Sequence, residues 1–441
     1  MSTAVMDARQ QSWLMRYRWW ILVAAIIAQI PNANLQYAWT LFPSHMVDEG
    51  LGKLSQVQGI FALFVLLETW LVPFDGWLVD RFGPRLLTLA GGVLIGISWV
   101  MCSTAHTLGS LLFWYGIVGG VGAGIIYGAT VATALKWFSD HRGLAAGLVA
   151  AGFGAGAALS VAPIEATIKA AGYRHAFLEF GILQGIIVIL AALFLAAPPE
   201  GFRVAGAAMQ RVSRAVRQAA QDSTWGEMLR TPHFWVMWVM MILVAGSGLM
   251  ATAQLGPIAK SFKIDNVVVL WGLTSLVLAL QVDRVLNGIT RPIWGWVSDH
   301  IGRENSMFIA FGVQGFAILW LLSVLSHPIW FIVASGAAFF FWGEMFSLFP
   351  AMVGDLYGRK YAATNYGLMY TAKGVGSIWA GPVAAGLFEA QHSWTMVFWI
   401  AAIANFVASA MAILVLKRMS LPKPQMIPQM VPATGGGGGA D

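Results

Sequence analysis

Residues 287–303 read NGITRPIWGWVSDHIGR and place one arginine, Arg291, inside an apolar segment that ends in a short charged turn. Residues 73–85, PFDGWLVDRFGPR, repeat that turn. When Pro73 is aligned with Pro292, the two stretches share Pro, Gly, Trp, Asp and Gly, which are five identities in eleven positions. The same alignment sets Val72 opposite Arg291. The chain is therefore predicted to be a duplication whose halves have diverged at the arginine.

The composition is that of an integral membrane protein. Of the 441 residues, 58% are hydrophobic and only 10% are charged, and the mean hydropathy is +0.70. That leaves too little polar surface for a water-soluble protein. A helix needs about 20 apolar residues to cross a bilayer of about 30 Å, and such stretches recur along the whole chain. Twelve spans are predicted, at residues 18–42, 55–79, 86–105, 108–136, 143–168, 175–197, 232–259, 268–297, 305–325, 328–356, 362–388 and 393–416.

These spans predict an all-α membrane protein, with twelve transmembrane helices in two pseudo-symmetric six-helix halves. The polar segment between the halves has an Ala/Gln/Arg-rich middle, residues 205–221, which fits an amphipathic surface helix and a partly disordered tether equally well. The predicted units are a cytoplasmic N-terminus at 1–17, the N-terminal bundle at 18–197, a cytoplasmic linker at 198–231, the C-terminal bundle at 232–416 and a disordered cytoplasmic tail at 417–441.

The distribution of basic residues predicts the orientation in the membrane. Eighteen Lys and Arg residues fall in the termini, the linker and the loops on one side, and five fall on the other side. Because basic loops stay in the cytoplasm, both termini are predicted to be cytoplasmic in a bacterial inner (plasma) membrane. Three basic residues, Arg284, Arg291 and Lys373, lie within spans. The net charge of +6 thus follows from topology, and nucleic acid is not needed to explain it.

The repeated turn carries a family signature. It reads G-x-x-x-D-R-x-G-x-R in the first half and G-x-x-x-D-H-x-G-R in the second, and it resembles the loop signature of the major facilitator superfamily. Glycine permits a tight turn, and an aspartate there can hold a helix N-terminus or a basic partner. The resemblance implies a twelve-helix transporter fold in which these turns serve gating. The gating residues are Gly76, Asp80, Arg81 and Gly83 in the first half and Gly295, Asp299, Gly302 and Arg303 in the second.

The cations within the spans are the candidate functional residues, because a charge at the bilayer centre costs at least about 2.5 kcal/mol. Arg291 precedes Asp299 by eight residues, about 12 Å of helix, so it is expected near mid-membrane. Lys373 is expected at a similar depth, and its repeat partner is Phe153. Two unpaired cations facing one cavity would suit a small dianion, or two carboxylates in turn. Arg284 is expected to snorkel toward the far membrane surface.

The alternative is that intramembrane acids neutralise these cations. The candidate acids are Glu68, Asp283 and Glu344, and Asp283 is expected to pair locally or with Arg284.

Four short motifs narrow the resemblance. LQYAWTLF at 35–42, NGITRP around Arg291, FWGE at 341–344 and TAKG at 371–374 resemble the oxalate:formate antiporter family. The resemblance implies that Arg291 and Lys373 bind substrate carboxylates. It also implies a tyrosine where this chain has Phe346, so one hydroxyl is missing and oxalate itself is less certain. The remaining implied cavity residues are Gln36, Tyr37, Tyr127 and Trp342.

The predicted function is secondary transport of small carboxylates, oxalate, formate or similar, most simply by anion exchange. The alternative is a proton-coupled monocarboxylate symporter, a family that resembles this chain at the Arg-Pro of span eight but has an aspartate one turn earlier. Asn287 stands at that position, which favours exchange, while Glu68 and Glu344 keep symport open. A membrane enzyme or sensor is a remote alternative, since no H-E-x-x-H, G-x-S-x-G or G-x-x-x-x-G-K-[ST] pattern occurs. We expect a monomer in the lipid bilayer, with no cofactor and no metal.

Overall fold

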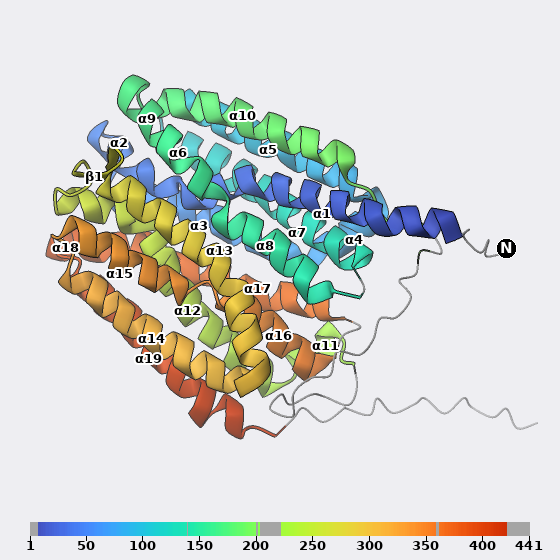
Figure 1. Ribbon diagram of the computed structural model, residues 1–441. Coiled ribbons are helices and arrows are strands. Elements are labelled where there is room, and N and C mark those ends of the chain that lie inside the picture. The colour runs from blue at the N-terminus through green and yellow to red at the C-terminus, as the bar shows by residue number, and fades with distance from the viewer. Residues whose placement is uncertain (1–7, 139, 200–201, 203–221, 359–360, 421–441) are drawn as a thin grey trace, which may run out of the picture.

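Long helices arranged in two bundles make up the chain. The computed structural model describes residues 8–138, 140–199, 202, 222–358 and 361–420. In Figure 1 the first bundle, blue to green, fills the upper part of the view, and the second, yellow-green to red, fills the lower part. The all-α prediction is confirmed apart from one short hairpin. The predictions for residues 205–221 and for most of the C-terminal tail lie outside the described residues.

Among its described residues the first bundle holds six helical rods that are long and apolar enough to cross a membrane, and four of them comprise more than one element. Pro73 cannot donate a backbone hydrogen bond, and the second rod is broken just before it, at Leu71. The elements are α1 (Ala8–Tyr37), η1 (Trp39–Leu41), α2 (Pro43–Asp48), α3 (Leu54–Trp70), α4 (Val72–Phe82), α5 (Pro84–Ser103), α6 (Leu108–Leu111), η2 (Leu112–Gly119), α7 (Gly120–Trp137), α8 (Arg142–Gly156), η3 (Ala157–Leu159), α9 (Val161–Ala171) and α10 (Tyr173–Phe194).

The second bundle repeats this arrangement after a short helix in the linker. Its elements are α11 (Trp225–Leu229), α12 (Pro232–Ser261), β1 (Val268–Leu270), β2 (Leu273–Thr274), α13 (Ser275–Ile301), α14 (Arg303–Ser323), α15 (Pro328–Phe340), α16 (Met345–Tyr357), α17 (Ala362–Ile378), η4 (Trp379–Val383), α18 (Ala384–Gln391), α19 (Thr395–Leu414) and η5 (Leu416–Arg418).

Ten helical segments among the described residues are long and apolar enough to cross a membrane. The two rods that fall short of this test, α13 and α17 with its continuation, carry the predicted membrane cations. The predicted start of span eight at residue 268 is wrong, because β1 and β2 form an antiparallel hairpin there. Positive φ angles at Trp271 (50°) and Gly272 (73°) make its two-residue turn. The helix begins only at Ser275, where the Thr274 side chain caps it.

The two ends of the bundle differ. In Figure 1 the start of α1, α4 and α11 lie at the right, here called the terminal end, and α2, β1, α9 and α18 lie at the left, here called the loop end. The repeated turns lie at the terminal end, after α4 and α13. Gly83 (φ 77°) and Gly302 (φ 92°) adopt the conformation that favours glycine, as predicted.

The aspartates of both turns have basic partners, as predicted. Asp80 pairs with Lys136 on α7, and Asp299 pairs with Arg303 at 2.6 Å. Arg303 also donates from Nε to Asp355 at 2.9 Å. Each of these ion pairs lies within one half of the protein. The other predicted gating residues lie on the same helices: Gly76 and Arg81 on α4 and Gly295 on α13.

The start of α1 is anchored at the terminal end by a two-bond ion pair. Arg18 donates to both carboxylate oxygens of Asp140, at 2.8 and 3.0 Å. Burial by itself would raise the pKa of the Asp140 carboxyl, but the hydrogen bonds from Arg18 and His141 hold that pKa below its usual value.

The halves meet along two symmetry-related helix pairs. α3 of the first half packs against α17 of the second, and α8 packs against α13. A Cβ on Gly374 would overlap the Thr69 hydroxyl, and one on Gly154 would lie 2.9 Å from an Arg291 nitrogen. The two glycines are partners in the repeat. Small residues at equivalent positions therefore let both helix pairs approach closely.

Two glycines of α8 offer a matched test of how α8 packs on α1 within the first half. A Cβ on Gly156 would lie 2.7 Å from the backbone Cα and O of Ile30, whereas one on Gly147 would meet nothing within 4 Å. Gly156→Ala should therefore lower the melting temperature of the detergent-solubilised protein by several degrees. Gly147→Ala should leave it unchanged or raise it, since alanine favours a helix by roughly 1 kcal/mol. Equal melting temperatures for the two variants would contradict the α1–α8 packing.

Candidate functional site

Lys373 lies on α17 between the halves, and polar side chains surround its ammonium group. Its side chain is fully buried. The ammonium donates to Gln36 Oε1 at 2.6 Å, to both carboxylate oxygens of Glu68 at 3.1 and 3.2 Å, and to the Tyr370 hydroxyl at 3.1 Å. The prediction of an unpaired lysine is therefore wrong. The acid reaches it because α3, which carries Glu68, packs directly on α17 beside Gly374.

Arg291 has no acidic partner among the described residues, as predicted. Its guanidinium is 2% exposed. It donates to the carbonyl oxygen of Ala150 on α8 at 2.5 Å and to Asn287 Oδ1 at 3.1 Å. Its Nε has no hydrogen-bond partner within the described part of the chain. Both acceptors are neutral, so the positive charge of Arg291 is solvated by dipoles and not cancelled.

Aromatic rings join the two cations. The Phe346 ring centroid lies 4.4 Å from Arg291 Cζ and 5.9 Å from Lys373 Nζ. The two cationic centres therefore lie against the same aromatic ring. Tyr127 stacks on Tyr370 with ring centroids 5.5 Å apart.

The other predicted wall residues belong to the same cluster. Phe153, 5.6 Å from the lysine nitrogen, contacts both Tyr37 and Tyr127, with centroids 5.4 and 5.5 Å apart. Trp342 packs edge-on against Phe346 at 5.5 Å. The fold thus brings together all seven predicted binding residues: Gln36, Tyr37, Tyr127, Arg291, Trp342, Phe346 and Lys373.

Arg284 is a third cation in the same region, and the expectation that it snorkels is wrong. Its side chain is fully buried, and its Nε and both terminal nitrogens have no hydrogen-bond partner among the described residues. The guanidinium lies between two rings, 4.4 Å from the Tyr37 centroid and 4.2 Å from the Phe339 centroid. The spacing of seven residues, about 10 Å of helix, places it on the same face of α13 as Arg291. That spacing was the signal by which the sequence could have revealed it.

Asp283 and Glu344 form no ion pair with these cations in the described structure. Both side chains are fully buried, and no ion pair joins Asp283 to Arg284 or either acid to Arg291 or Lys373. The expected pairing of Asp283 with Arg284 is therefore wrong. Glu68 alone of the three candidate acids touches a cation. In the repeat Glu68 corresponds to Asn287, the residue that accepts from Arg291. No group of three His, Cys, Asp or Glu side chains within the described residues could hold a metal ion.

Comparisons with known proteins agree with this arrangement. Residues 21–286 and 284–430 match the family model of the Major Facilitator Superfamily. The chain is also 33% identical to the "Oxalate:formate antiporter" of Oxalobacter formigenes, over 95% of its own length and 96% of that protein. The chain belongs to the major facilitator superfamily, in the family of the oxalate:formate antiporter.

Membership of this superfamily makes the chain a multi-pass membrane transporter and not an enzyme, as predicted. More distant relatives are consistent with it. The chain is 27% identical to the "Uncharacterized MFS-type transporter YhjX" of Escherichia coli (strain K12), over 82% of the chain and 86% of that protein. It is 24% identical to the "Apicoplast pyruvate carrier 1" of Toxoplasma gondii, over 73% of the chain and 67% of that protein.

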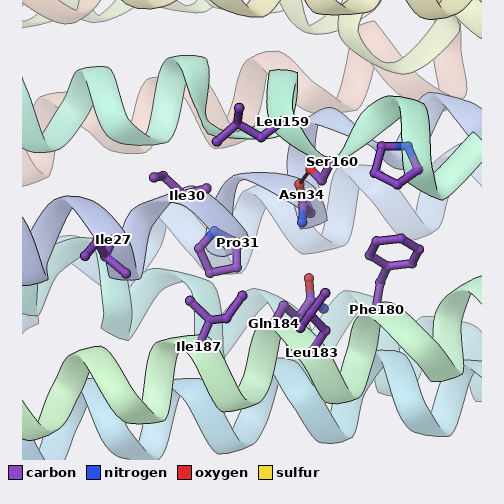
Figure 2. A pocket seen from close by; sticks show the side chains of 11 residues that line it. Ile27, Ile30, Pro31, Asn34, Leu159, Ser160, Phe180, Leu183, Gln184 and Ile187 are labelled. Atoms are coloured by element: carbon purple, nitrogen blue, oxygen red, sulfur yellow. Dashed lines mark hydrogen bonds between the residues drawn. The ribbon is translucent and has the colours of Figure 1, made fainter.

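A groove with a volume of about 280 Å³ lies in the first half, and Arg284, Arg291 and Lys373 do not line it. Figure 2 shows aliphatic side chains around it, with Asn34 and Gln184 directed toward each other near its middle and Ser160 bonded to Asn34. No charged side chain lines this groove, so it offers no counter-ion to a charged substrate. Its lining comes from α1, η3, α9 and α10: Ile27, Ile30, Pro31, Asn34, Leu159, Ser160, Pro163, Phe180, Leu183, Gln184 and Ile187.

The halves also close over the site at the loop end. Asp48 pairs with Lys260, and Glu389 accepts from the backbone nitrogen and the hydroxyl of Ser55 at 2.8 and 2.7 Å. About one turn further along α3, Gln58 donates to Gln254 at 3.1 Å. Contacts of Gly367 with Pro73 join the halves toward the terminal end. The cation cluster is therefore enclosed from both ends.

The Lys373–Glu68 ion pair predicts that removing the lysine alone destabilises the protein more than removing both charges. Lys373→Ala leaves a buried carboxylate without its cation, and breaking such a pair typically costs about 3 kcal/mol or more. The variant should therefore melt well below the wild type in detergent at neutral pH. The double variant Lys373→Ala, Glu68→Gln removes both charges and should recover most of the loss. If the double variant melts no higher than the single one, the pair does not hold the halves together.

Proposed function

We propose that the chain exchanges small carboxylate anions, such as oxalate and formate, across a bacterial inner membrane by alternating access. The observation that carries this proposal is Arg291, whose buried guanidinium lies between the halves without an acidic partner among the described residues. A cation in that position is costly, by at least about 2.5 kcal/mol on insertion scales, unless a counter-ion joins it. A substrate carboxylate would supply the missing charge through charge-assisted hydrogen bonds.

The proposed roles of the neighbouring residues follow from the functional groups of their side chains. Lys373, which lies against the same Phe346 ring as Arg291, would take a second carboxylate. Gln36 Nε2 and Trp342 Nε1 have no hydrogen-bond partner in the described residues, so both are available to donate to substrate. Tyr37, Tyr127 and Phe346 would form the walls.

Gating would be shared between the two repeated turns at the terminal end, which we place in the cytoplasm on the count of basic residues. The two six-helix halves would rock against each other about the α3–α17 and α8–α13 contacts. The turn residues Gly76, Asp80, Arg81 and Gly83, and Gly295, Asp299, Gly302 and Arg303, would hold the cytoplasmic ends during that movement.

Exchange is favoured over proton symport because Asn287, the side chain that contacts Arg291, cannot take a proton. The second candidate, proton-coupled monocarboxylate symport, is favoured by one contact, that of Glu68 with Lys373, since a carboxylate on a substrate cation is a proton acceptor. The relative named as a pyruvate carrier also supports a monocarboxylate as the substrate.

Reconstituted vesicles separate these candidates. Vesicles are loaded with oxalate, with formate or with neither, and uptake of labelled oxalate is followed with and without a pH gradient. Exchange predicts rapid uptake only into loaded vesicles. Symport predicts uptake into empty vesicles that requires external acid.

Substitution of Arg291 tests its proposed role. Arg291→Ala should insert and fold but lose exchange by about 30-fold or more, because a hydrogen bond to a charged group contributes about 2 kcal/mol. Arg291→Lys should recover only part of the rate, since lysine lacks the planar fork that binds a carboxylate through two bonds. Arg174→Ala, which removes an arginine at the loop end, is the control and should retain exchange. Full exchange by Arg291→Ala would refute the assignment.

A further inference from the structure

Arg284 differs from Arg291 and Lys373 because none of its guanidinium nitrogens has a hydrogen-bond acceptor in the described part of the chain. Its side chain is fully buried, and Nε and both terminal nitrogens have no partner there. Lys373 is paired with Glu68, and Arg291 donates to a backbone carbonyl and to a side-chain amide oxygen. A buried charge without hydrogen bonds is costly, so the Arg284 guanidinium is a place where an anion is strongly favoured.

The buried acids of this region do not form an ion pair with Arg284. Glu68 is held by Lys373. Asp283 precedes Arg284 on α13, and the side chains of consecutive helical residues do not face each other. Asp283 acts on Arg284 electrostatically, but no ion pair joins Arg284 to Asp283 or to Glu344 within the described structure. Of these three acids, only Glu68 is therefore in contact with one of the three cations.

Two aromatic rings from different halves cover the guanidinium. The centroids of Tyr37 on α1 and Phe339 on α15 lie 4.4 and 4.2 Å from the Arg284 Cζ. Cation–π contacts stabilise a buried cation, but they do not replace the acceptors that its N–H groups lack. Tyr37 belongs to the first half and Arg284 to the second, so this cover depends on how the two halves are placed.

Arg284 lies nearer the loop end than Arg291 does. α13 begins at Ser275, next to the hairpin at the loop end, and it ends at the repeated turn at the terminal end. Seven residues, about 10 Å of helix, separate the two arginines along one face of α13. An anion that enters from the loop end therefore meets Arg284 before it meets Arg291.

Opening of the loop end uncovers Arg284. The ion pair of Asp48 with Lys260 closes this end and joins the two halves. Separation of the halves there moves α1, and with it the Tyr37 ring, away from α13. The guanidinium then loses the ring contributed by the first half and faces the entrance.

We propose that Arg284 is an outer carboxylate-binding subsite, available only while the protein is open at the loop end. One carboxylate group of the incoming anion pairs with Arg284 and then passes to Arg291. Closure of the loop end returns Tyr37 to the guanidinium and excludes the anion from it. The proposal rests on the proposed carboxylate transport and adds a second position for the substrate. An anion from the terminal end reaches Arg291 without passing Arg284, so the subsite serves one direction of entry.

The test measures exchange from each face of the membrane. Right-side-out and inverted membrane vesicles expose opposite ends of the protein, and protease access to an N-terminal tag identifies the exposed end. Uptake of labelled oxalate into oxalate-loaded vesicles gives the KM at that end. Arg284→Gln should raise KM about tenfold or more at the loop end, as expected for loss of a hydrogen bond to a charged group, and less than about threefold at the terminal end.

Further variants separate a binding role from a structural one. Arg284→Lys keeps the positive charge and should recover part of the affinity at the loop end. If Arg284 served only to balance Asp283, the double variant Arg284→Gln, Asp283→Asn would restore the wild-type KM, whereas we expect that KM to stay high. Arg174→Gln removes an arginine at the loop end outside the cluster, and it should keep both KM values.

Chemical modification of the wild type provides a measurement that needs no substitution. A membrane-impermeant arginine reagent, such as a sulfonated phenylglyoxal, should modify Arg284 from the loop end and not from the terminal end. Oxalate should slow this reaction several-fold. Mass spectrometry of the peptides identifies the modified arginine.

The outcomes separate the subsite from the transport function. An unchanged KM at the loop end, an equal rise at both ends, or restoration by Asp283→Asn overturns the subsite and leaves carboxylate transport in place. If Arg284→Gln does not fold, modification of the wild type decides: an Arg284 that stays unmodified in vesicles that exchange oxalate, or that oxalate does not protect, overturns the subsite. A wild type that exchanges neither oxalate nor formate overturns the function itself, and the subsite with it.

Discussion

The architecture of this protein depends on the burial of positive charge between its two halves. Arg291 is 2% exposed and Lys373 is fully buried, so bulk water does not solvate either charge. The protein supplies carbonyl and amide dipoles to the arginine and a carboxylate to the lysine. The two cations are therefore held in different electrostatic states. Arg291 has no acidic partner among the described residues, whereas the charge of Lys373 is balanced by Glu68.

Duplication explains how this arrangement came to lie on the interface. The pairs α3–α17 and α8–α13 are related by the repeat, and Gly154 and Gly374 allow both pairs to pack closely. A symmetric ancestor would have presented similar residues on both sides. In this chain the second half carries cations where the first half carries Val72 and Phe153, and the first half carries Glu68 where the second carries Asn287. At these repeat positions the cations lie on the second half and the acid on the first, which allows an ion pair to form between Lys373 and Glu68.

The sequence was sufficient for the features that depend on composition or on local geometry. Apolar spans predicted the helices, and the turn glycines predicted the left-handed backbone at Gly83 and Gly302. The cations were found because a charged residue in an apolar span is conspicuous. The pairing of Lys373 with Glu68 was not predictable in this way, because the two residues are 305 positions apart and meet only when α3 packs on α17. The burial of Arg284 and the hairpin before α13 were not predicted, for related reasons. The burial of Arg284 depends on rings from α1 and α15, which the sequence alone does not bring together. The hairpin before α13 has the apolar composition of a membrane span, and only the turn at Trp271 and Gly272 distinguishes it from a helix.

Arg291 and Lys373 are proposed to act together on one dicarboxylate. The most direct measurement is a double-mutant cycle of equilibrium binding, with Arg291→Gln, Lys373→Gln and the double variant titrated with oxalate and with formate in detergent. We expect the two substitutions to be coupled for oxalate, by about tenfold in Kd or more, and nearly independent for formate, which would engage Arg291 alone. Independent effects on oxalate binding would contradict it.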